Sequence, residues 1–212
     1  ADDFSIYCKN KSKAQETGNK VYLFLKNKLK LSINREKSGI RKPVQFGILG
    51  YRYVSTYAKG TKGKYQMAAG EKGWKKLKET LKEITKKTAP RSLTERMAQL
   101  KAAQRGWINY FRMASMQSKL SAVDSWVRNR LRKCIWHDWK KPERKRKNLM
   151  RLGVDAAHAY AFSRTRKGGW AVAQSPIMVT TVTLKRLQQR GYESLLDHYY
   201  KVAPQFSEPL IA

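Results

Sequence analysis

The chain is poor in the residues on which metal-binding and thiol chemistry depend. Its two cysteines, Cys8 and Cys134, are far apart, and neither has the Cys-x-x-Cys or His-x-x-x-His spacing of a zinc site. We therefore expect two free, buried, inert thiols and no zinc. The three histidines, His137, His158 and His198, are scattered along the chain, so packing or surface positions are favoured over a catalytic role.

Long apolar runs are also missing. No stretch approaches the roughly 20 consecutive apolar residues that a membrane-spanning helix needs, and no signal peptide opens the chain. The sequence therefore predicts a protein that neither spans a membrane nor is secreted. Its 212 residues are 41% hydrophobic and 11% aromatic, which is enough to bury a core in one or two domains.

Acidic residues are scarce beside basic ones. Forty-six Lys and Arg face 15 Asp and Glu, which gives a formal net charge of +31. A single basic run can be a solvated surface, but an excess over the whole chain exceeds what solubility requires and indicates a polyanionic partner. RNA or DNA is favoured over an anionic membrane surface.

Two of the few carboxylates, Asp2 and Asp3, stand next to each other before an apolar run, Phe4–Cys8. Neighbouring side chains on a straight strand point to opposite faces, so both could face one site only at the tip of a hairpin. Such a tip could hold Mg²⁺, with Phe4–Cys8 as a strand of the hairpin. A solvated acidic terminus is the alternative, and the dipeptide alone favours it.

The next 60 residues predict a small α+β region. Apolar residues at helical spacing predict a helix over about 11–31 that packs on a sheet. LSINREKSGI follows, with a brief strand at Ile33 and Asn34 and a turn at Ser38-Gly39. Two apolar runs in VQFGILGYRYV predict a hairpin or bulged strand, and a Gly- and Lys-rich stretch over 57–70, with a possible strand at 64–67, predicts a domain boundary.

The rest of the chain predicts helices. A stripe of Trp74, Leu77, Leu81 and Ile84 indicates an amphipathic helix over 71–87. Ser92 and Glu95 fit a capping box that opens a second helix, to about Ala114. Gly106 within it costs about 1 kcal/mol relative to Ala, which suggests a close helix contact. A third helix starts at Ser121, with Asp124 near its positive end and Arg128, Arg130, Arg132 and Lys133 mainly outward.

Basic and aromatic residues then alternate in a way that suits RNA. The cluster is Lys140, Lys141, Arg144, Lys145, Arg146 and Lys147, next to Trp136 and Trp139, and Arg164, Arg166 and Lys167 precede a predicted Gly-Gly turn. Guanidinium and indole planes can stack on unpaired bases while the charges meet phosphates. The two tryptophans fit a core position equally well.

Taken in order, ADDF, LSINREKSGI, FGILGY and GWINYF resemble the reverse transcriptase of mobile group II introns, from its YADD motif through its thumb, also called maturase domain X. The resemblance covers essentially the whole chain. It implies an α+β fold: the C-terminal remnant of a right-hand polymerase palm over residues 1–70, with short antiparallel strands and a helix, an all-helical thumb over 71–202, and a flexible tail over 203–212.

The resemblance also implies roles for individual residues. Asp2 and Asp3 would be catalytic Mg²⁺ ligands, and Asn34, Lys37 and Ser38 would lie near the side on which nucleotides enter. Gly47, Leu49, Gly50 and Tyr51 would form the primer grip. Gly106, Trp107, Tyr110 and Phe111 would be the thumb signature. Basic residues of the thumb would bind RNA. They are Arg128, Arg132, Lys140, Lys141, Arg144, Lys145, Arg146, Lys147, Arg164, Arg166 and Lys167.

The implied activity of the parent protein is RNA-directed DNA synthesis supported by two Mg²⁺ ions, together with splicing of the intron and its retrohoming. Its partners would be intron RNA, the RNA/DNA template-primer duplex and deoxynucleoside triphosphates. Because the first half of the palm and the fingers would precede Ala1, the chain alone is expected to be inactive in synthesis. The expected location is the cytoplasm, near the nucleoid of a prokaryote, or an organelle. The alternative is a maturase-type RNA-binding module without polymerisation; a generic basic binder would not carry these ordered motifs.

Overall fold

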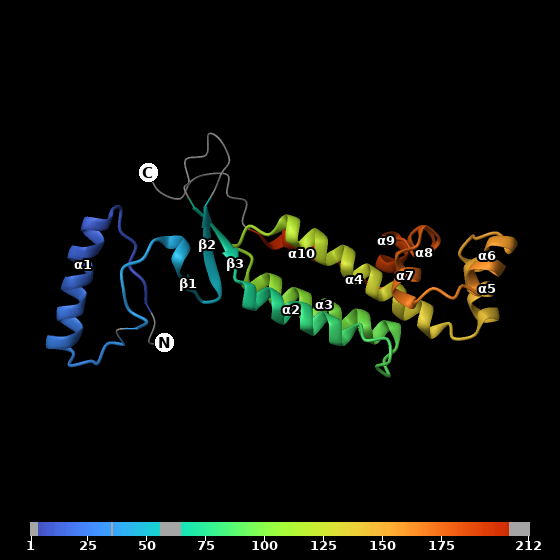
Figure 1. Ribbon diagram of the computed structural model, residues 1–212, viewed down its shortest axis with the longest axis horizontal. Coiled ribbons are helices and arrows are strands. Elements are labelled where there is room, and N and C mark those ends of the chain that lie inside the picture. Colours follow the sequence, from blue (N-terminus) through green and yellow to red (C-terminus); the bar gives the residue numbers. More distant parts are fainter. Residues whose placement is uncertain (1–3, 35, 56–64, 204–212) are drawn as a thin grey trace, which may run out of the picture. The chain divides into compact units, whose positions relative to one another are not determined.

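The structure, a computed structural model, describes residues 4–34, 36–55 and 65–203, and the chain divides into two compact units (Figure 1). The N-terminal unit is residues 1–70 and the C-terminal unit is residues 71–212. The described residues form ten α-helices and one three-stranded antiparallel sheet, a mixed fold consistent with the predicted α+β class. The identification of the units as palm and thumb stays a prediction.

Helix α1 of the N-terminal unit spans Lys11–Leu23 and continues as a π-helical turn, η1, over Phe24–Lys28. Asn10 begins it, because its side-chain oxygen accepts a hydrogen bond from the backbone N–H of Lys13 at 2.8 Å. The predicted helix is therefore present, but none of its residues is buried, so the expected packing on a sheet is wrong for the described residues. Its apolar stripe is too sparse, with no large apolar residue between Ala14 and Val21.

The predicted strand at Phe4–Cys8 is absent. A strand needs a neighbour for its backbone groups, and the described residues provide none for this segment. Instead, Tyr7 joins Phe46 and Tyr53 in an aromatic cluster, with ring centroids 5.9–6.3 Å apart. The Tyr53 hydroxyl donates to the Tyr7 hydroxyl at 3.2 Å, and burial together with this hydrogen bond raises the pKa of Tyr7 to about 12.

The predicted hairpin in VQFGILGYRYV is confirmed. After the 3₁₀ turn η2 (Pro43–Gln45), strand β1 (Gly47–Ile48) pairs with β2 (Tyr51–Ser55), and β2 pairs with β3 (Tyr65–Ala69), all antiparallel. The register sets Ile48 opposite Tyr51 and Tyr51 opposite Ala69. Only two residues therefore connect β1 to β2.

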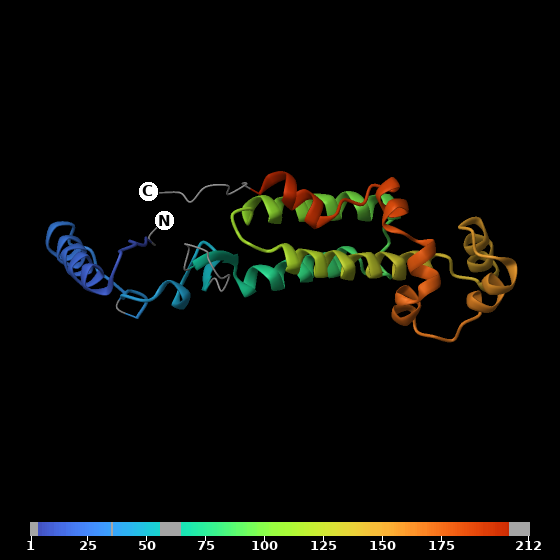
Figure 2. The ribbon, with the colours of Figure 1, turned by 90° about the horizontal axis from the view of Figure 1, so that it is seen from above.

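The C-terminal unit is built on three long helices, α2 (Glu71–Ile84), α3 (Leu93–Tyr110) and α4 (Gln117–Asp138). Short connections make consecutive helices run antiparallel (Figure 2), and α2 packs on both α3 and α4. All four residues of the predicted stripe on α2 are buried. The capping box of α3 is also confirmed: Ser92 N–H donates to Glu95 Oε2 at 2.6 Å, and Glu95 N–H donates to Ser92 Oγ at 3.1 Å.

Six shorter helices complete this unit: α5 (Pro142–Arg151), α6 (Ala156–Ser163), α7 (Gly169–Gln174), α8 (Pro176–Thr181), α9 (Leu184–Gln189) and α10 (Leu195–Val202). Helices α5 and α6 pack together, α7 packs on α4, and α10 packs on both α3 and α4. The predicted Gly-Gly turn is instead the start of a helix, since Gly168 is the N-cap of α7.

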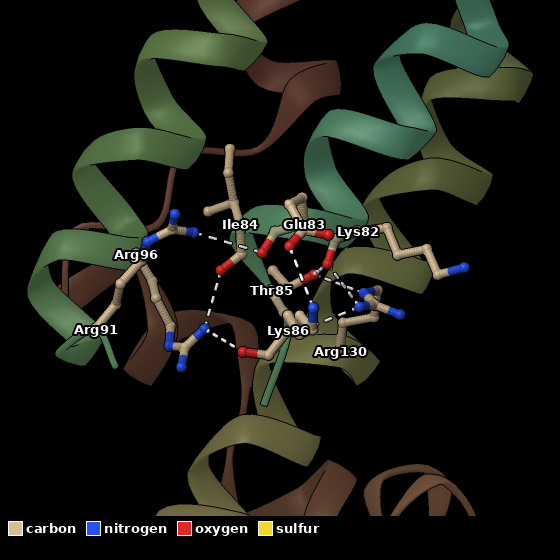
Figure 3. A network of polar contacts seen from close by, with 8 residues as sticks. All are labelled: Lys82, Glu83, Ile84, Thr85, Lys86, Arg91, Arg96 and Arg130. Carbon is tan, nitrogen blue, oxygen red and sulfur yellow. Dashed lines mark hydrogen bonds and ion pairs between the residues drawn. The ribbon is translucent and has the colours of Figure 1, made fainter. Parts of the chain in front are cut away.

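Arginine side chains bind the carbonyl groups at the C-terminus of α2 (Figure 3). Arg96, only 1% exposed, donates to the carbonyl oxygens of Ile84, Lys86 and Ala89 at 2.8–2.9 Å. Arg130 donates to the carbonyl oxygen of Lys82 at 2.8 Å, so it points inward and not outward as predicted. These cations satisfy carbonyls that have no partner within a helix and favour its negative end. They stabilise the end of α2 at Ile84, three residues before the predicted end of this helix.

A buried carboxylate joins α4 to α10. Asp124, 2% exposed, accepts hydrogen bonds from Tyr192 Oη at 2.7 Å and Ser194 Oγ at 2.6 Å. It also accepts from the backbone N–H groups of Leu195 and Leu196, at 2.9 and 3.0 Å, in the first turn of α10. The sequence suggested that Asp124 serves the dipole of its own helix. The structure shows that it binds the start of another one.

The close helix contact expected at Gly106 is found at Gly73 instead. A Cβ atom on Gly106 would meet nothing within 4 Å, whereas one on Gly73 would lie 3.1 Å from Cζ of Phe111. The Nε1–H group of Trp107 donates to the carbonyl oxygen of Gly73 at 3.1 Å, and the Trp107 ring lies 4.6 Å from Trp74 and 4.7 Å from Phe111. Gly73 therefore permits the aromatic contact between α2 and α3.

These two glycines should respond oppositely to alanine. Gly106→Ala is expected to stabilise the protein by about 0.5–1 kcal/mol, because alanine costs less backbone entropy in an open helical position. Gly73→Ala is expected to destabilise it by about 1 kcal/mol, because the displaced Phe111 ring outweighs the helix propensity gained. Urea unfolding of both variants checks this, and a gain for Gly73→Ala would contradict the contact.

Candidate nucleic-acid interface

Helix α5 carries a row of exposed basic side chains. Lys141, at its N-cap, is followed by Arg144, Lys147 and Arg151, which recur every three or four residues and so share one face. No carboxylate among the described residues forms an ion pair with any of these four, which we call the α5 basic row. Leu149, fully buried, anchors the opposite side of the helix.

Other predicted RNA-binding residues are in different surroundings. Arg132 is only 6% exposed, and its Nε–H group donates to the carbonyl oxygen of Val182 at 3.0 Å. Burial lowers the pKa of Arg132. Its guanidinium binds within the fold, so Arg132 is not part of the candidate interface. Arg146 and Arg164 share Glu143, at 3.5 and 2.6 Å, which partly neutralises them.

The remaining members of the predicted set differ in exposure. Arg128 is half-buried on α4. Arg166 and Lys167 are exposed between α6 and α7, and no ion pair of theirs is found within the described residues. They remain available to a ligand.

A pocket of about 330 Å³ lies where α4, α5 and α7 meet the segment after α2. Its lining is Lys87, Lys133, Trp136, His137, Lys140, Lys145 and Gly169, and we call it the lysine pocket. The Lys145 ammonium lies 4.4 Å from the centre of the Trp136 ring. Trp136 is 6% exposed and also packs on Phe162, at 5.5 Å between ring centres. Trp136 is therefore a core residue, which was the alternative to stacking on RNA bases. Trp139 is half-buried beside it.

The lysine pocket has a strong excess of positive charge. No carboxylate among residues 4–34, 36–55 and 65–203 forms an ion pair with its four lysines. Burial lowers the pKa of Lys145, which is the effect expected when an ammonium loses water without gaining an anion. Sequence reasoning missed Lys87 and Lys133, because they come from other elements and only the folded chain brings them to Lys140 and Lys145.

The predicted nucleotide-side residues form one tight turn. Asn34 Oδ1 accepts hydrogen bonds from the backbone N–H groups of Glu36 and Lys37 at 3.0 and 3.2 Å, and Ser38 N–H donates to the Asn34 carbonyl oxygen at 3.0 Å. The turn is centred on Glu36 and Lys37, and the predicted strand at Ile33 and Asn34 is wrong because the Asn34 side chain binds the backbone locally.

The predicted primer-grip residues form the β1–β2 hairpin and its tip. Leu49 and Gly50 connect the strands with φ of 51° and 77°, as in the two-residue turns that favour Asn-Gly. Leu49 is 74% exposed in this uncommon conformation. A Cβ atom on Gly47 would lie 2.5 Å from the carbonyl oxygen of Tyr51, so only glycine fits there.

Asp2 and Asp3, the predicted Mg²⁺ ligands, lie outside the described residues. Within the described part, no three His, Cys, Asp or Glu side chains come together as a metal site. Cys134 is buried, as predicted, and burial raises the pKa of its thiol. Cys8 is only partly buried, so the prediction of a buried thiol is wrong at that position. No helix among the described residues has the length and hydropathy to cross a membrane.

The C-terminal unit has features typical of nucleic-acid-binding proteins: exposed basic side chains along one face of α5 and a cationic pocket. Residues 74–153 match the family model of the group II intron, maturase-specific domain. The match runs from α2 through α5 and includes the α5 basic row, the aromatic cluster around Trp107 and most of the lysine pocket. A search of curated proteins gave no match.

Proposed function

We propose that the chain binds folded group II intron RNA through its C-terminal unit and assists splicing. The observation that carries the proposal is the α5 basic row, whose members have no ion-pair partner among the described residues and lie within the segment that matches the maturase-specific domain. Lys and Arg on a rigid helix can neutralise successive phosphates of a folded RNA, and such contacts position the RNA without reading its sequence.

Charge reversal of the α5 basic row tests this proposal. The double variant Arg144→Glu with Lys147→Glu is expected to lower affinity for intron RNA by at least about tenfold at 0.1 M salt, because two phosphate contacts are lost. Filter binding or fluorescence anisotropy measures it. The loss should be similar across structured RNAs.

A matched control reverses two exposed lysines outside the matched segment, Lys185 on α9 and Lys201 on α10. It adds the same charge as the α5 variant and should weaken binding less. Equal loss from both double variants would favour a nonspecific effect of net charge over an interface on α5.

The finer proposal is that the chain is the C-terminal part of a group II intron reverse transcriptase, with the N-terminal unit as the end of its palm. Large apolar side chains of this unit are half or more exposed, including Phe4, Leu23, Phe24 and Leu49, which suits a segment that packs against further protein. The Tyr7 cluster holds the segment after Asp3 beside the hairpin. This contact supports the proposal that the hairpin carries a primer, in a site that Asp2 and Asp3 would complete.

In that proposal Asp2 and Asp3 would hold Mg²⁺, which supplies charge stabilisation in phosphoryl transfer. The Asn34 turn, with Lys37 and Ser38, would face the deoxynucleoside triphosphate, and the backbone of Gly47–Tyr51 would support the primer end of the template-primer duplex. An RNA-binding maturase module without synthesis is the alternative. In that alternative the C-terminal unit binds RNA in the same way, and Asp2 and Asp3 have no catalytic role.

A further inference from the structure

One residue of the lysine pocket has a backbone conformation that its side chain does not favour. Lys140 follows the end of α4 with φ of 45°, in the left-handed region, and its N–H donates to the carbonyl oxygen of His137 at 3.1 Å. This position after a helix is usually glycine, because a Cβ atom is strained there. The conformation ends α4 and turns the chain toward α5, while a lysine at the turn lines the pocket.

The four lysines converge from separate parts of the C-terminal unit. Lys87 follows α2, Lys133 lies on α4, Lys140 follows α4, and Lys145 lies on α5. The Lys133 stem passes 3.8 Å from where a Cβ atom of Gly169 would be. Four cations around one hollow repel one another, and a ligand with spread negative charge would relieve that repulsion.

We propose that the lysine pocket is a phosphate-binding subsite that takes the sugar-phosphate backbone of a single-stranded segment of RNA. The inference rests on the proposed RNA binding and names a particular place for it. The α5 basic row covers an exposed helix face, whereas the pocket is concave and would hold a phosphate on several sides. A strand that bends there could be reached by lysines from three directions.

The lining of the pocket, four lysines and two aromatic residues, suits phosphate better than base stacking. Two aromatic side chains line the pocket: the Lys145 ammonium already covers the ring of Trp136, and His137 Nδ1 lies 3.6 Å from Asp138 Oδ1. Phe162 and Trp139 pack against the same indole. Trp136 is therefore a positioning residue that holds Lys145, and the part of the RNA that enters is its anionic backbone.

The strained backbone of Lys140 provides a sharp test in the full chain. Lys140→Gly should keep or raise the melting temperature, by up to roughly 2–4 °C, because glycine relieves the strain. The same variant should bind a short single-stranded oligoribonucleotide about fivefold more weakly at 0.1 M salt, which is the counterion release of one contact. Lys140→Arg should retain affinity. A Lys140→Gly protein that binds as tightly as the wild type would overturn the proposal.

Lys30 is the matched control, because it is an exposed lysine with φ of 54° in the N-terminal unit, outside the pocket. Lys30→Gly should relieve similar strain and leave affinity for the oligoribonucleotide unchanged. If Lys140→Gly lowers the melting temperature, the affinity of Lys133→Gln for the oligoribonucleotide tests the pocket instead. This variant removes the charge of Lys133 and keeps the aliphatic part of its side chain. Unchanged affinity in that folded variant would equally overturn the pocket.

Lysine footprinting separates this proposal from general RNA binding. Amine-reactive labelling read by mass spectrometry should show Lys87, Lys133 and Lys140 protected when the oligoribonucleotide is bound. Protection of Lys141 and Lys147 alone would leave RNA binding intact and contradict the pocket. A wild-type chain that binds no RNA at all would instead contradict the proposed function itself.

Discussion

Asp124→Asn is expected to destabilise the C-terminal unit by about 3–5 kcal/mol, because it breaks a buried network around a charged group. The buried carboxylate accepts four hydrogen bonds, two from side chains and two from backbone N–H groups of α10. An amide has one acceptor oxygen and presents two donors of its own, so buried donors would be left without acceptors. Urea unfolding followed by circular dichroism measures the change.

Asp138→Asn is the control, because Asp138 is exposed on the same helix. It should change stability by no more than about 0.5 kcal/mol. Tyr192 reports on the same network: burial and the Asp124 carboxylate raise its pKa, so an Asp124→Asn protein that still folds should show a lower Tyr192 pKa. A stability of Asp124→Asn equal to that of Asp138→Asn would mean that α10 is held by packing alone.

Asp2→Ala is expected to lower DNA synthesis by at least about 10²–10³-fold in a reverse transcriptase that carries this chain at its C-terminal end. Metal-held charge at a transferring phosphoryl group is worth several kcal/mol, and every 1.36 kcal/mol is a factor of ten in rate. RNA binding should persist, because it is assigned to Lys and Arg beyond Gly70. A paired assay of cDNA synthesis and intron splicing measures both.

Glu16→Ala is the control for that assay, because Glu16 is an exposed carboxylate of the same unit that pairs with Lys13 and Lys20. It should leave synthesis unchanged. If Asp2→Ala abolished splicing as completely as synthesis in a folded protein, the division of roles between the two units would be wrong. Unchanged synthesis would contradict the assignment of Asp2 as a metal ligand.

Local patterns in the sequence were reliable where the structure depends on local physics. The stripe on α2 has helical spacing, and the Ser92–Glu95 capping box is closed by residues three apart, so both were predictable. The β1–β2 hairpin was also predictable, because two short apolar runs around Gly47 and Gly50 indicated a hairpin or a bulged strand. The strand predicted at Phe4–Cys8 is absent, because a strand depends on a neighbouring strand, and the sequence of the segment alone does not say whether one is there.

Contacts between distant residues could not be read from the sequence. Arg96, Arg130 and Arg132 look like solvated cations in a basic helix, yet each binds carbonyl oxygens inside the fold. Asp124 meets its partners about 70 residues later in the chain. The lysine pocket needs α2, α4, α5 and α7 to be placed first, so sequence reasoning found Lys140 and Lys145 without Lys87 and Lys133.

The salt dependence of RNA binding by the 212-residue chain tests the central claim most directly. If six to ten phosphates are contacted, affinity for intron RNA should fall by about 10³–10⁵ between 50 and 200 mM salt. The slope of log K against log salt should become shallower by about two units in the Arg144→Glu, Lys147→Glu variant. An affinity that does not change with salt, or a slope that is equal in both proteins, would contradict binding through phosphates at α5.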